Sequence, residues 1–230
     1  MVTFAAGRIS AEVSEESIFI IGAGHFGGRA ARSLVKKSKG PVFIVDIDEN
    51  SISQVKDLPV KLIVYDGSRF LIDNSHLLKP PNLIIPALPI HLAFEWLKRY
   101  LYGRLKIKQI SFPQEIRDFL PFTWPGSEGS LLISYADFIC PDDCSEPEYC
   151  TVTGERREIP LHDLVEGLEL DDFGVHVIKS LQLAPGVGGY KVEDLMKAAE
   201  IIVQNKEGKW LISTACRCHG ILTAFEAQPY

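Results

Sequence analysis

The chain has 230 residues, a formal net charge of −6 and 46% hydrophobic residues. This length suits one large α/β domain or a nucleotide-binding core with an appendage, and the composition is typical of a globular protein. The negative charge and the lack of a basic arm in the sequence argue against a nucleic-acid surface. Met1–Glu16 shows no charged-then-apolar signal pattern, and no apolar run approaches the roughly 20 residues of a membrane span. We therefore expect a cytoplasmic protein without membrane insertion.

Short apolar runs rich in β-branched residues recur through the first half of the chain, at Ile18–Ile21, Val42–Val45, Leu62–Tyr65, Leu83–Pro86 and Ile107–Phe112. Helical or loop segments separate the first four runs, which is the spacing of βαβ units. Because the runs are continuous rather than alternating, we expect both faces of the strands to be buried, as in a parallel sheet covered by helices. The pattern predicts an α/β fold with a doubly wound, mainly parallel, Rossmann-like sheet and a C-terminal α/β extension.

Prolines and glycines interrupt the pattern after Phe112. We place a Rossmann dinucleotide-binding core in residues 1–125 and a C-terminal extension with a cysteine-rich loop in residues 126–230, and the strands of the extension could continue the same sheet. The expected elements there are strands over Ser130–Phe138, Val175–Leu183 and Trp210–Ala215 and a helix over Val192–Gln204. The glycine-rich segment Pro185–Tyr190 is interpreted as a flexible connection.

The first apolar run leads into Gly22, Gly24 and Gly27, a GxGxxG motif, and then into a helix-forming segment. Such a motif gives a tight turn at the first glycine, close approach of a pyrophosphate at the second, and close packing of helix on strand at the third. Asp46 ends the second apolar run, where an acidic side chain accepts a ribose 2′-hydroxyl and would repel a 2′-phosphate. The motif therefore favours NAD over NADP, with a purely structural glycine turn as the alternative.

From Ile18 to about Tyr100 the chain resembles the TrkA N-terminal family, the nucleotide-binding domain of potassium-channel and transporter regulators, also called RCK or KTN. The matching pieces are Ile20–Gly27, Val45–Glu49 and Val64–Ser68. In that family the glycine turn cradles the pyrophosphate, an acid after the second strand holds the adenosine ribose, and an acid after the third strand lies near the adenine.

The resemblance implies NAD-type binding by five residues: Gly22, Gly24, Gly27, Asp46 and Asp66. For Asp46 the alternative is a capping carboxylate, and for Asp66 it is ordinary Asp-Gly-Ser turn chemistry. His25 and Phe26 occupy the free positions of the turn, where they either touch the cofactor or pack. The resemblance also leaves open a homodimer and a membrane-transporter partner.

All five cysteines fall in two clusters: Cys140, Cys144 and Cys150, and then Cys216 and Cys218. The first three lie in a polar loop with acidic and proline neighbours, whereas structural cysteines would be scattered on apolar strands. Thiolates that converge from such a loop can bind zinc or an iron–sulfur cluster, with His219 as a further ligand. The spacing is neither that of a zinc-ribbon CxxC pair nor that of a ferredoxin, so a disulfide or redox pair and inert thiols stay as alternatives.

His91 follows the fourth apolar run and begins a predicted helix. Open α/β sheets bind ligands at the carboxyl ends of their strands, so His91 is the candidate catalytic residue for proton transfer beside a nicotinamide. The alternative is a solvent-facing residue at the start of the helix.

Two functions follow from these residues. One is an NAD(H)-binding regulatory or sensor protein of TrkA-N-like type, with a cysteine-ligated metal or redox site as a second input. The other is an NAD-dependent oxidoreductase coupled to a cysteine-bound iron–sulfur or zinc site. A tetrapyrrole-pathway dehydrogenase of the precorrin-2 type, which also begins with a short Rossmann domain, is a third candidate.

Overall fold

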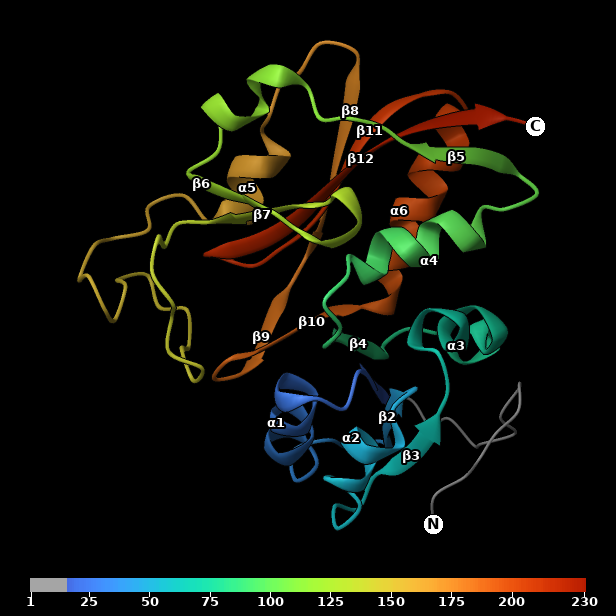
Figure 1. Ribbon diagram of the computed structural model, residues 1–230, viewed down its shortest axis with the longest axis vertical. Coiled ribbons are helices and arrows are strands. Elements are labelled where there is room, and N and C mark those ends of the chain that lie inside the picture. The colour runs from blue at the N-terminus through green and yellow to red at the C-terminus, as the bar shows by residue number, and fades with distance from the viewer. Residues whose placement is uncertain (1–15) are drawn as a thin grey trace. The chain divides into compact units, whose positions relative to one another are not determined.

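The computed structural model describes residues 16–230, which form two compact units (Figure 1). Unit 1 contains residues 16–88 and Val187–Glu193, and unit 2 contains Pro89–Gly186 and Asp194–Tyr230. The division therefore falls at Leu88 rather than between residues 125 and 126, because the fifth apolar run belongs to a strand of unit 2. The expectation about a signal pattern in Met1–Glu16 lies almost wholly outside the described residues.

The sheet of unit 1 has the strand order β3-β2-β1-β4-β10. Four parallel strands, β1 (Ile18–Ile21), β2 (Val42–Asp46), β3 (Lys61–Val64) and β4 (Leu83–Pro86), are joined by β10 (Val187–Lys191), which is antiparallel to β4. The order of the first four strands is that of the dinucleotide-binding fold. The predicted α/β class and parallel Rossmann-like sheet are confirmed for this unit.

A helix follows each of the first three strands of unit 1. These helices are α1 (His25–Leu34), α2 (Glu49–Ser53) and α3 (Gly67–Asp73), and a 3₁₀ turn over Ser75–Leu77 precedes β4. The buried face of α1 consists of small residues and one leucine: Gly27, Gly28, Ala30, Ala31 and Leu34. Small side chains on this face let the helix axis approach the sheet closely.

Aromatic and aliphatic side chains fill the core of unit 1. Phe19 and Phe43 stack with ring centroids 5.0 Å apart, and Tyr190 of β10 is fully buried. The buried side chain of Asn82 accepts a hydrogen bond from the Ser17 amide at 2.8 Å, and its backbone oxygen accepts one from Val192. These bonds fix the starts of β1 and β4 to the segment after β10.

The prediction of a flexible connection over Pro185–Tyr190 is wrong from Val187 onward, where the chain forms the strand β10. This strand pairs with β4 through Tyr190↔Ile84 and Lys191↔Leu83. Glycines disfavour a strand by themselves. Here β4, which is about 100 residues away in the sequence, pairs with the segment and makes it a strand. The local sequence pattern contains no sign of this pairing.

Unit 2 is built on a mixed sheet with the order β6-β7-β12-β11-β8, and β5 also pairs with β12. Its strands are β5 (Leu105–Gln109), β6 (Phe122–Pro125), β7 (Leu131–Ser134), β8 (Phe173–Lys179), β11 (Gly208–Ala215) and β12 (His219–Pro229), and β9 (Leu181–Ala184) precedes the return to unit 1. Only β8 and β11 are parallel neighbours in this sheet; the other described pairs are antiparallel.

Helices cover both faces of the unit 2 sheet. They are α4 (Leu92–Tyr100), α5 (Leu161–Glu166) and α6 (Val192–Asn205), with 3₁₀ turns over Gln114–Asp118 and Ser127–Gly129. Leu222 of β12 lies in one core cluster with Leu161 of α5, whereas Phe225 of β12 packs against Phe94 of α4 at a centroid distance of 5.5 Å. Since residues three apart on a strand face opposite sides, α4 and α5 cover opposite faces of β12.

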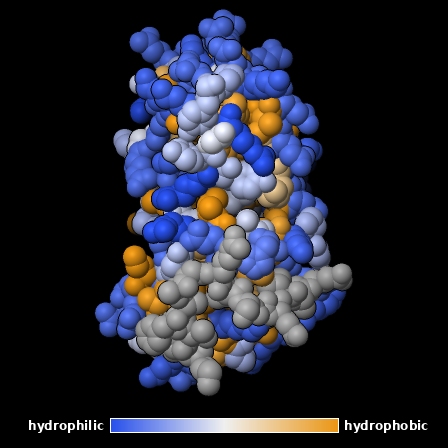
Figure 2. Space-filling model, turned by 90° about the vertical axis from the view of Figure 1, so that its right-hand side faces the viewer, coloured by the Kyte–Doolittle hydropathy of each residue, from blue (hydrophilic) through white to orange (hydrophobic). Residues whose placement is uncertain are grey.

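Within the described residues, no helix combines the length and the apolar character that crossing a bilayer requires. The longest, α6, has 14 residues. On the face shown in Figure 2, hydrophobic residues form small separate groups among hydrophilic ones.

Candidate functional site

The turn between β1 and α1 has no room for side chains at two of its glycines. Gly22 has φ +110°, and its amide donates a hydrogen bond to the Val45 oxygen at 2.7 Å. A Cβ on Gly22 would lie 2.4 Å from the Ala87 oxygen, and a Cβ on Gly27 would lie 1.9 Å from the Gly22 oxygen. The turn therefore requires glycine at both positions for its own packing.

Gly24 differs from the other two glycines, because a Cβ there would meet nothing within 4 Å. Its φ of −64° is accessible to any residue, so the fold of the unit does not require a glycine at this position. Gly24 is the N-cap of α1, whose start has no side-chain cap and no acidic residue in its first turn. Open space beside the N-terminus of a helix is the environment that suits a pyrophosphate.

Both carboxylate oxygens of Asp46 accept backbone hydrogen bonds, one from the glycine turn and one from the loop after β2. Its Oδ2 accepts a hydrogen bond from the Ala23 amide at 2.6 Å, and its Oδ1 accepts one from the Asp48 amide at 2.8 Å. The capping of α2 is performed by Asp48 instead, whose side chain accepts from the Asn50 and Ser51 amides. Asp46 is thus a positioned carboxylate with lone pairs left for hydroxyl donors.

Asp66 is the N-cap of α3 and accepts hydrogen bonds from the Arg69 amide and the Ser68 hydroxyl, each at 2.8 Å. The sequence offered ordinary Asp-Gly-Ser turn chemistry as the alternative role of Asp66, and in the structure this carboxylate caps α3. The next residue, Gly67, lies so close to β1 that a Cβ would meet Ile21 at 2.3 Å. The N-terminus of α3 is therefore packed against the end of β1, next to the glycine turn.

His25 and Phe26, in the free positions of the turn, are both exposed, and Phe26 exposes 59% of its surface. Their rings meet edge to face with centroids 5.2 Å apart. They form an exposed aromatic pair at the first turn of α1, where a bound nucleotide could contact them.

His91 is a buried residue of unit 2, which differs from its expected place beside a cofactor. Its Nδ1 lies 2.8 Å from the Thr223 hydroxyl and its Nε2 lies 3.1 Å from the Thr214 hydroxyl. Burial lowers the pKa of its imidazole to about 3. With both nitrogens engaged and the ring neutral, His91 stabilises the packing of α4 on β11 and β12, and the structure gives it no access to a substrate.

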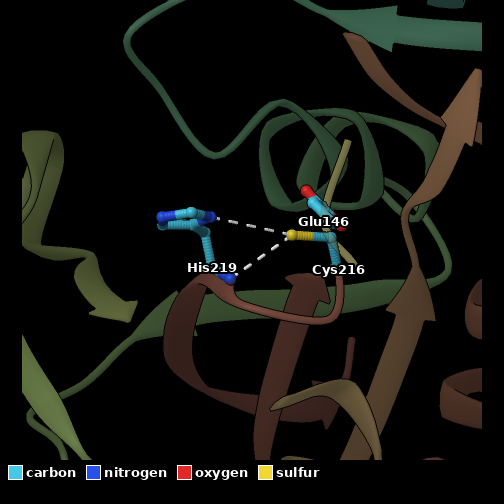
Figure 3. Close-up of side chains that lie close together, drawn as sticks. All are labelled: Glu146, Cys216 and His219. Carbon is cyan, nitrogen blue, oxygen red and sulfur yellow. Dashed lines mark hydrogen bonds between the residues drawn. The ribbon is translucent and has the colours of Figure 1, made fainter. Parts of the chain in front are cut away.

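A second group of polar side chains surrounds the tip of the β11–β12 hairpin. The Cys216 amide donates to the His219 oxygen at 2.8 Å and closes the turn over residues 216–219. The ligand atoms of Glu146, Cys216 and His219 all lie within 4.8 Å of one another. Figure 3 shows the Cys216 thiol pointing toward His219, whose Nδ1 is 4.0 Å and whose amide nitrogen is 3.3 Å from the sulfur, with Glu146 beside it.

The polar loop over residues 140–158 docks on this hairpin tip. Cys140 Sγ lies 3.4 Å from His219 Nε2, the opposite ring nitrogen from the one facing Cys216. The Arg217 amide donates to a Glu146 carboxylate oxygen at 3.4 Å, and the Arg217 guanidinium donates to the Arg157 backbone oxygen at 3.1 Å. A long loop without helices or strands is thus ordered by side chains that it shares with the hairpin.

The five cysteines form no disulfide, and neighbouring thiols influence the pKa values of Cys140 and Cys218. Burial, followed by the neighbouring thiols Cys144 and Cys150, raises the pKa of Cys140. Burial and then Glu146 raise the pKa of Cys218 to about 11, and the same two causes raise that of Cys216. Hydrogen bonds from Thr153 lower the pKa of Cys150 to about 7. The two cysteine clusters therefore lie in one region of unit 2, to which Glu146 and His219 also belong.

Unit 1 combines a parallel Rossmann-like sheet, a glycine turn and a positioned acid, which is the arrangement of dinucleotide-binding domains. The sequence profile of the TrkA-N domain matches residues 18–72, which confirms the resemblance over that segment. A second profile, that of the AF_1314_C family, described as "Uncharacterized protein, C-terminal domain", matches residues 93–228.

A protein of Archaeoglobus fulgidus described as "Uncharacterized protein" is 34% identical over 227 residues, which covers 90% of this chain and 98% of that protein. The chain belongs to the AF_1314_C family.

Proposed function

We propose that this protein is an NAD(H)-binding regulatory protein, in which the glycine turn of unit 1 holds the dinucleotide. The observation that carries the proposal is Gly24. Neither its backbone conformation nor its surroundings demand a glycine, yet a side chain there would fill the open space beside the N-terminus of α1. A glycine without a packing reason, at the point where a phosphate group has to approach, is explained by a ligand.

The other residues of the turn have complementary roles in this proposal. The pyrophosphate lies at the α1 N-terminus, and Asp46 accepts the hydroxyls of the adenosine ribose. Asp66 at the start of α3 lies toward the adenine, with His25 and Phe26 at the rim. A carboxylate at the ribose position repels a 2′-phosphate, so the expected cofactor is NAD(H) rather than NADP(H).

A regulatory role is supported over dehydrogenase chemistry by His91. The residue that the sequence offers for proton transfer is neutral and enclosed between two threonines. Bound NAD(H) would then act through its affinity for one conformational state of the protein. A metal at the cysteine–histidine cluster belongs to the proposal as a second input, whereas a homodimer, a transporter partner and a cytoplasmic location stay predictions.

The test is calorimetric titration of NADH, NAD⁺ and NADPH into wild-type protein and three variants. Gly24→Val should abolish measurable NADH binding while the ligand-free protein stays folded, with a loss of about 0.5–1 kcal/mol in stability because valine is a poorer N-cap than glycine. Asp46→Asn should weaken NADH binding by about 10-fold or more, the loss expected for charge-assisted hydrogen bonds. Asp48→Asn is the matched control, because it makes the same change two residues away and asparagine caps helices equally well.

A melting temperature unmoved by saturating NADH would contradict the proposal, as would a Gly24→Val variant that binds like wild type. Consumption of NADH with any added substrate would instead point to the oxidoreductase alternative.

A further inference from the structure

We propose that unit 2 binds one zinc-class divalent ion between the 140–158 loop and the β11–β12 hairpin, through Cys140, Glu146, Cys216 and His219. This inference deepens the metal component of the proposed function and does not depend on nucleotide binding.

The ligand atoms of Glu146, Cys216 and His219 already lie within 4.8 Å of one another, and Cys140 contacts the other ring nitrogen of His219. Cys140 Sγ and His219 Nε2 are 3.4 Å apart, and Cys216 Sγ and His219 Nδ1 are 4.0 Å apart. With Zn–S bonds of about 2.3 Å and Zn–N bonds of about 2.0 Å, neighbouring ligands of a tetrahedral ion lie about 3.5 Å apart. Because the two thiols face opposite nitrogens of one imidazole, binding of one ion at Nδ1 with Glu146 and Cys216 requires the Cys140 thiol to move toward that nitrogen with its loop.

The chemistry of the donor set favours zinc over a cluster. Two thiols, one imidazole and one carboxylate are ligands that zinc accepts together. Iron–sulfur clusters are held chiefly by four thiolates, and the irons and sulfides between those thiolates would separate the sulfurs farther than the donors of one ion. Glu146, Cys216 and His219, whose ligand atoms lie within 4.8 Å of one another, form a mixed donor set that suits one ion.

Neighbouring groups orient the proposed ligands. The His219 amide donates to Cys216 Sγ at 3.3 Å, an N–H···S contact that favours the thiolate, and the Arg217 amide donates to Glu146. Such outer contacts fix ligand geometry in metal sites. Four protein ligands leave no open position for water, so the ion would be structural. It would hold the 140–158 loop against the β11–β12 hairpin.

The experiment uses the full chain, purified without oxygen and stripped of metal, and titrated with Co²⁺ and Zn²⁺. Wild type should bind one ion per chain and show the visible bands of tetrahedral Co²⁺, with a thiolate-to-cobalt charge-transfer intensity that corresponds to two sulfurs. Cys216→Ser, Cys140→Ser and His219→Gln should each lower Zn²⁺ affinity by about 100-fold or more, beyond the loss typical of outer-shell changes.

Cys150→Ser is the matched control, because it makes the same chemical change in the same loop and should leave the affinity unchanged. Circular dichroism of each metal-free variant, compared with metal-free wild type, separates lost ligation from lost folding. A Glu146→Gln variant, which keeps the size of the side chain, provides a fourth test if Cys216→Ser does not fold.

The inference is overturned if Cys150→Ser and Cys144→Ser abolish Co²⁺ binding while Cys216→Ser retains it, or if the charge-transfer intensity requires four sulfurs. A brown protein with acid-labile sulfide, or no metal bound at all, would overturn it equally. NADH titration of the same variants distinguishes the zinc proposal from the nucleotide proposal. A wild-type protein that binds NADH but no metal refutes the zinc proposal and leaves the nucleotide proposal intact.

Discussion

His91 is enclosed by two threonines from β11 and β12, and this enclosure makes it a pH-sensitive element of unit 2. Its pKa is about 3 in the folded protein and about 6.5 in an unfolded chain. The folded state therefore binds fewer protons than the unfolded state between these values. The stability from neutral His91 is complete above pH 6.5 and is lost as the pH falls toward 3.

At pH 5 this group alone should lower the free energy of unfolding of unit 2 by about 2 kcal/mol relative to pH 7. His91→Gln, which can still bond both threonines, should flatten this part of the pH dependence. All three tryptophans, Trp96, Trp124 and Trp210, belong to unit 2, so urea unfolding followed by tryptophan fluorescence measures this unit. Equal slopes for variant and wild type between pH 7 and pH 5 would rule out the assigned role.

At the level of single residues, the sequence predicts most of the nucleotide turn and little of the histidine chemistry. Gly22, Gly27 and Asp46 are recognisable because local spacing after an apolar strand determines their places. The predicted position of His91 differs from the observed one because its hydrogen-bond partners lie 123 and 132 residues away in the sequence. No local sequence pattern indicates such partners. Glu146 was missed for a similar reason, although its position two residues after Cys144 was an available signal.

Among the elements, the parallel pair β8 and β11 depends on one small residue. Gly174 is in register with Trp210, and a Cβ on Gly174 would lie 2.7 Å from the indole ring. Gly174→Ala should lower the free energy of unfolding of unit 2 by about 1–3 kcal/mol, the usual cost of overpacking a core.

Gly167→Ala at the end of α5 is the comparison variant, since its Cβ would meet no atom closer than 3.4 Å. Urea unfolding followed by tryptophan fluorescence measures both variants. If the two midpoints coincide, the Trp210 ring can move aside and the predicted constraint does not exist.

Elements with strong local patterns were predicted well, and those that depend on distant partners were not. The helix expected over Val192–Gln204 is α6, within one residue at its C-terminal end. The strand expected over Val175–Leu183 is split into β8 and β9. The strand β12 was not predicted at all, because it begins with the polar residue His219 and its apolar residues follow only later. This strand pairs with β5, β7 and β11 at the centre of its sheet.

For the whole molecule, β10 makes unit 1 discontinuous in sequence. Without Val187–Glu193 the free edge of β4 is exposed and the buried side chains of Val187, Tyr190 and Val192 are missing. At about 1.5–3 kcal/mol for each of these three buried side chains, this loss amounts to about 5–9 kcal/mol.

A fragment of residues 1–88 should therefore lack a cooperative thermal transition in circular dichroism. A second fragment, in which a short Gly-Ser linker joins Leu88 to Val187–Glu193, should recover one. A cooperative transition of the shorter fragment at the same temperature as the longer one would refute the requirement for β10.

Because the chain returns to unit 1 late in the sequence, the sheet of unit 1 can be completed only late in synthesis. Ribosomes add about 5–20 residues per second, so about 5–20 s pass between the emergence of β4 and that of β10, while Pro89–Gly186 is being translated. During that interval the nascent chain carries an open strand edge, which is a site for mispairing. The nucleotide-binding unit is the first to begin folding, yet it has to wait for most of the chain before its sheet is complete.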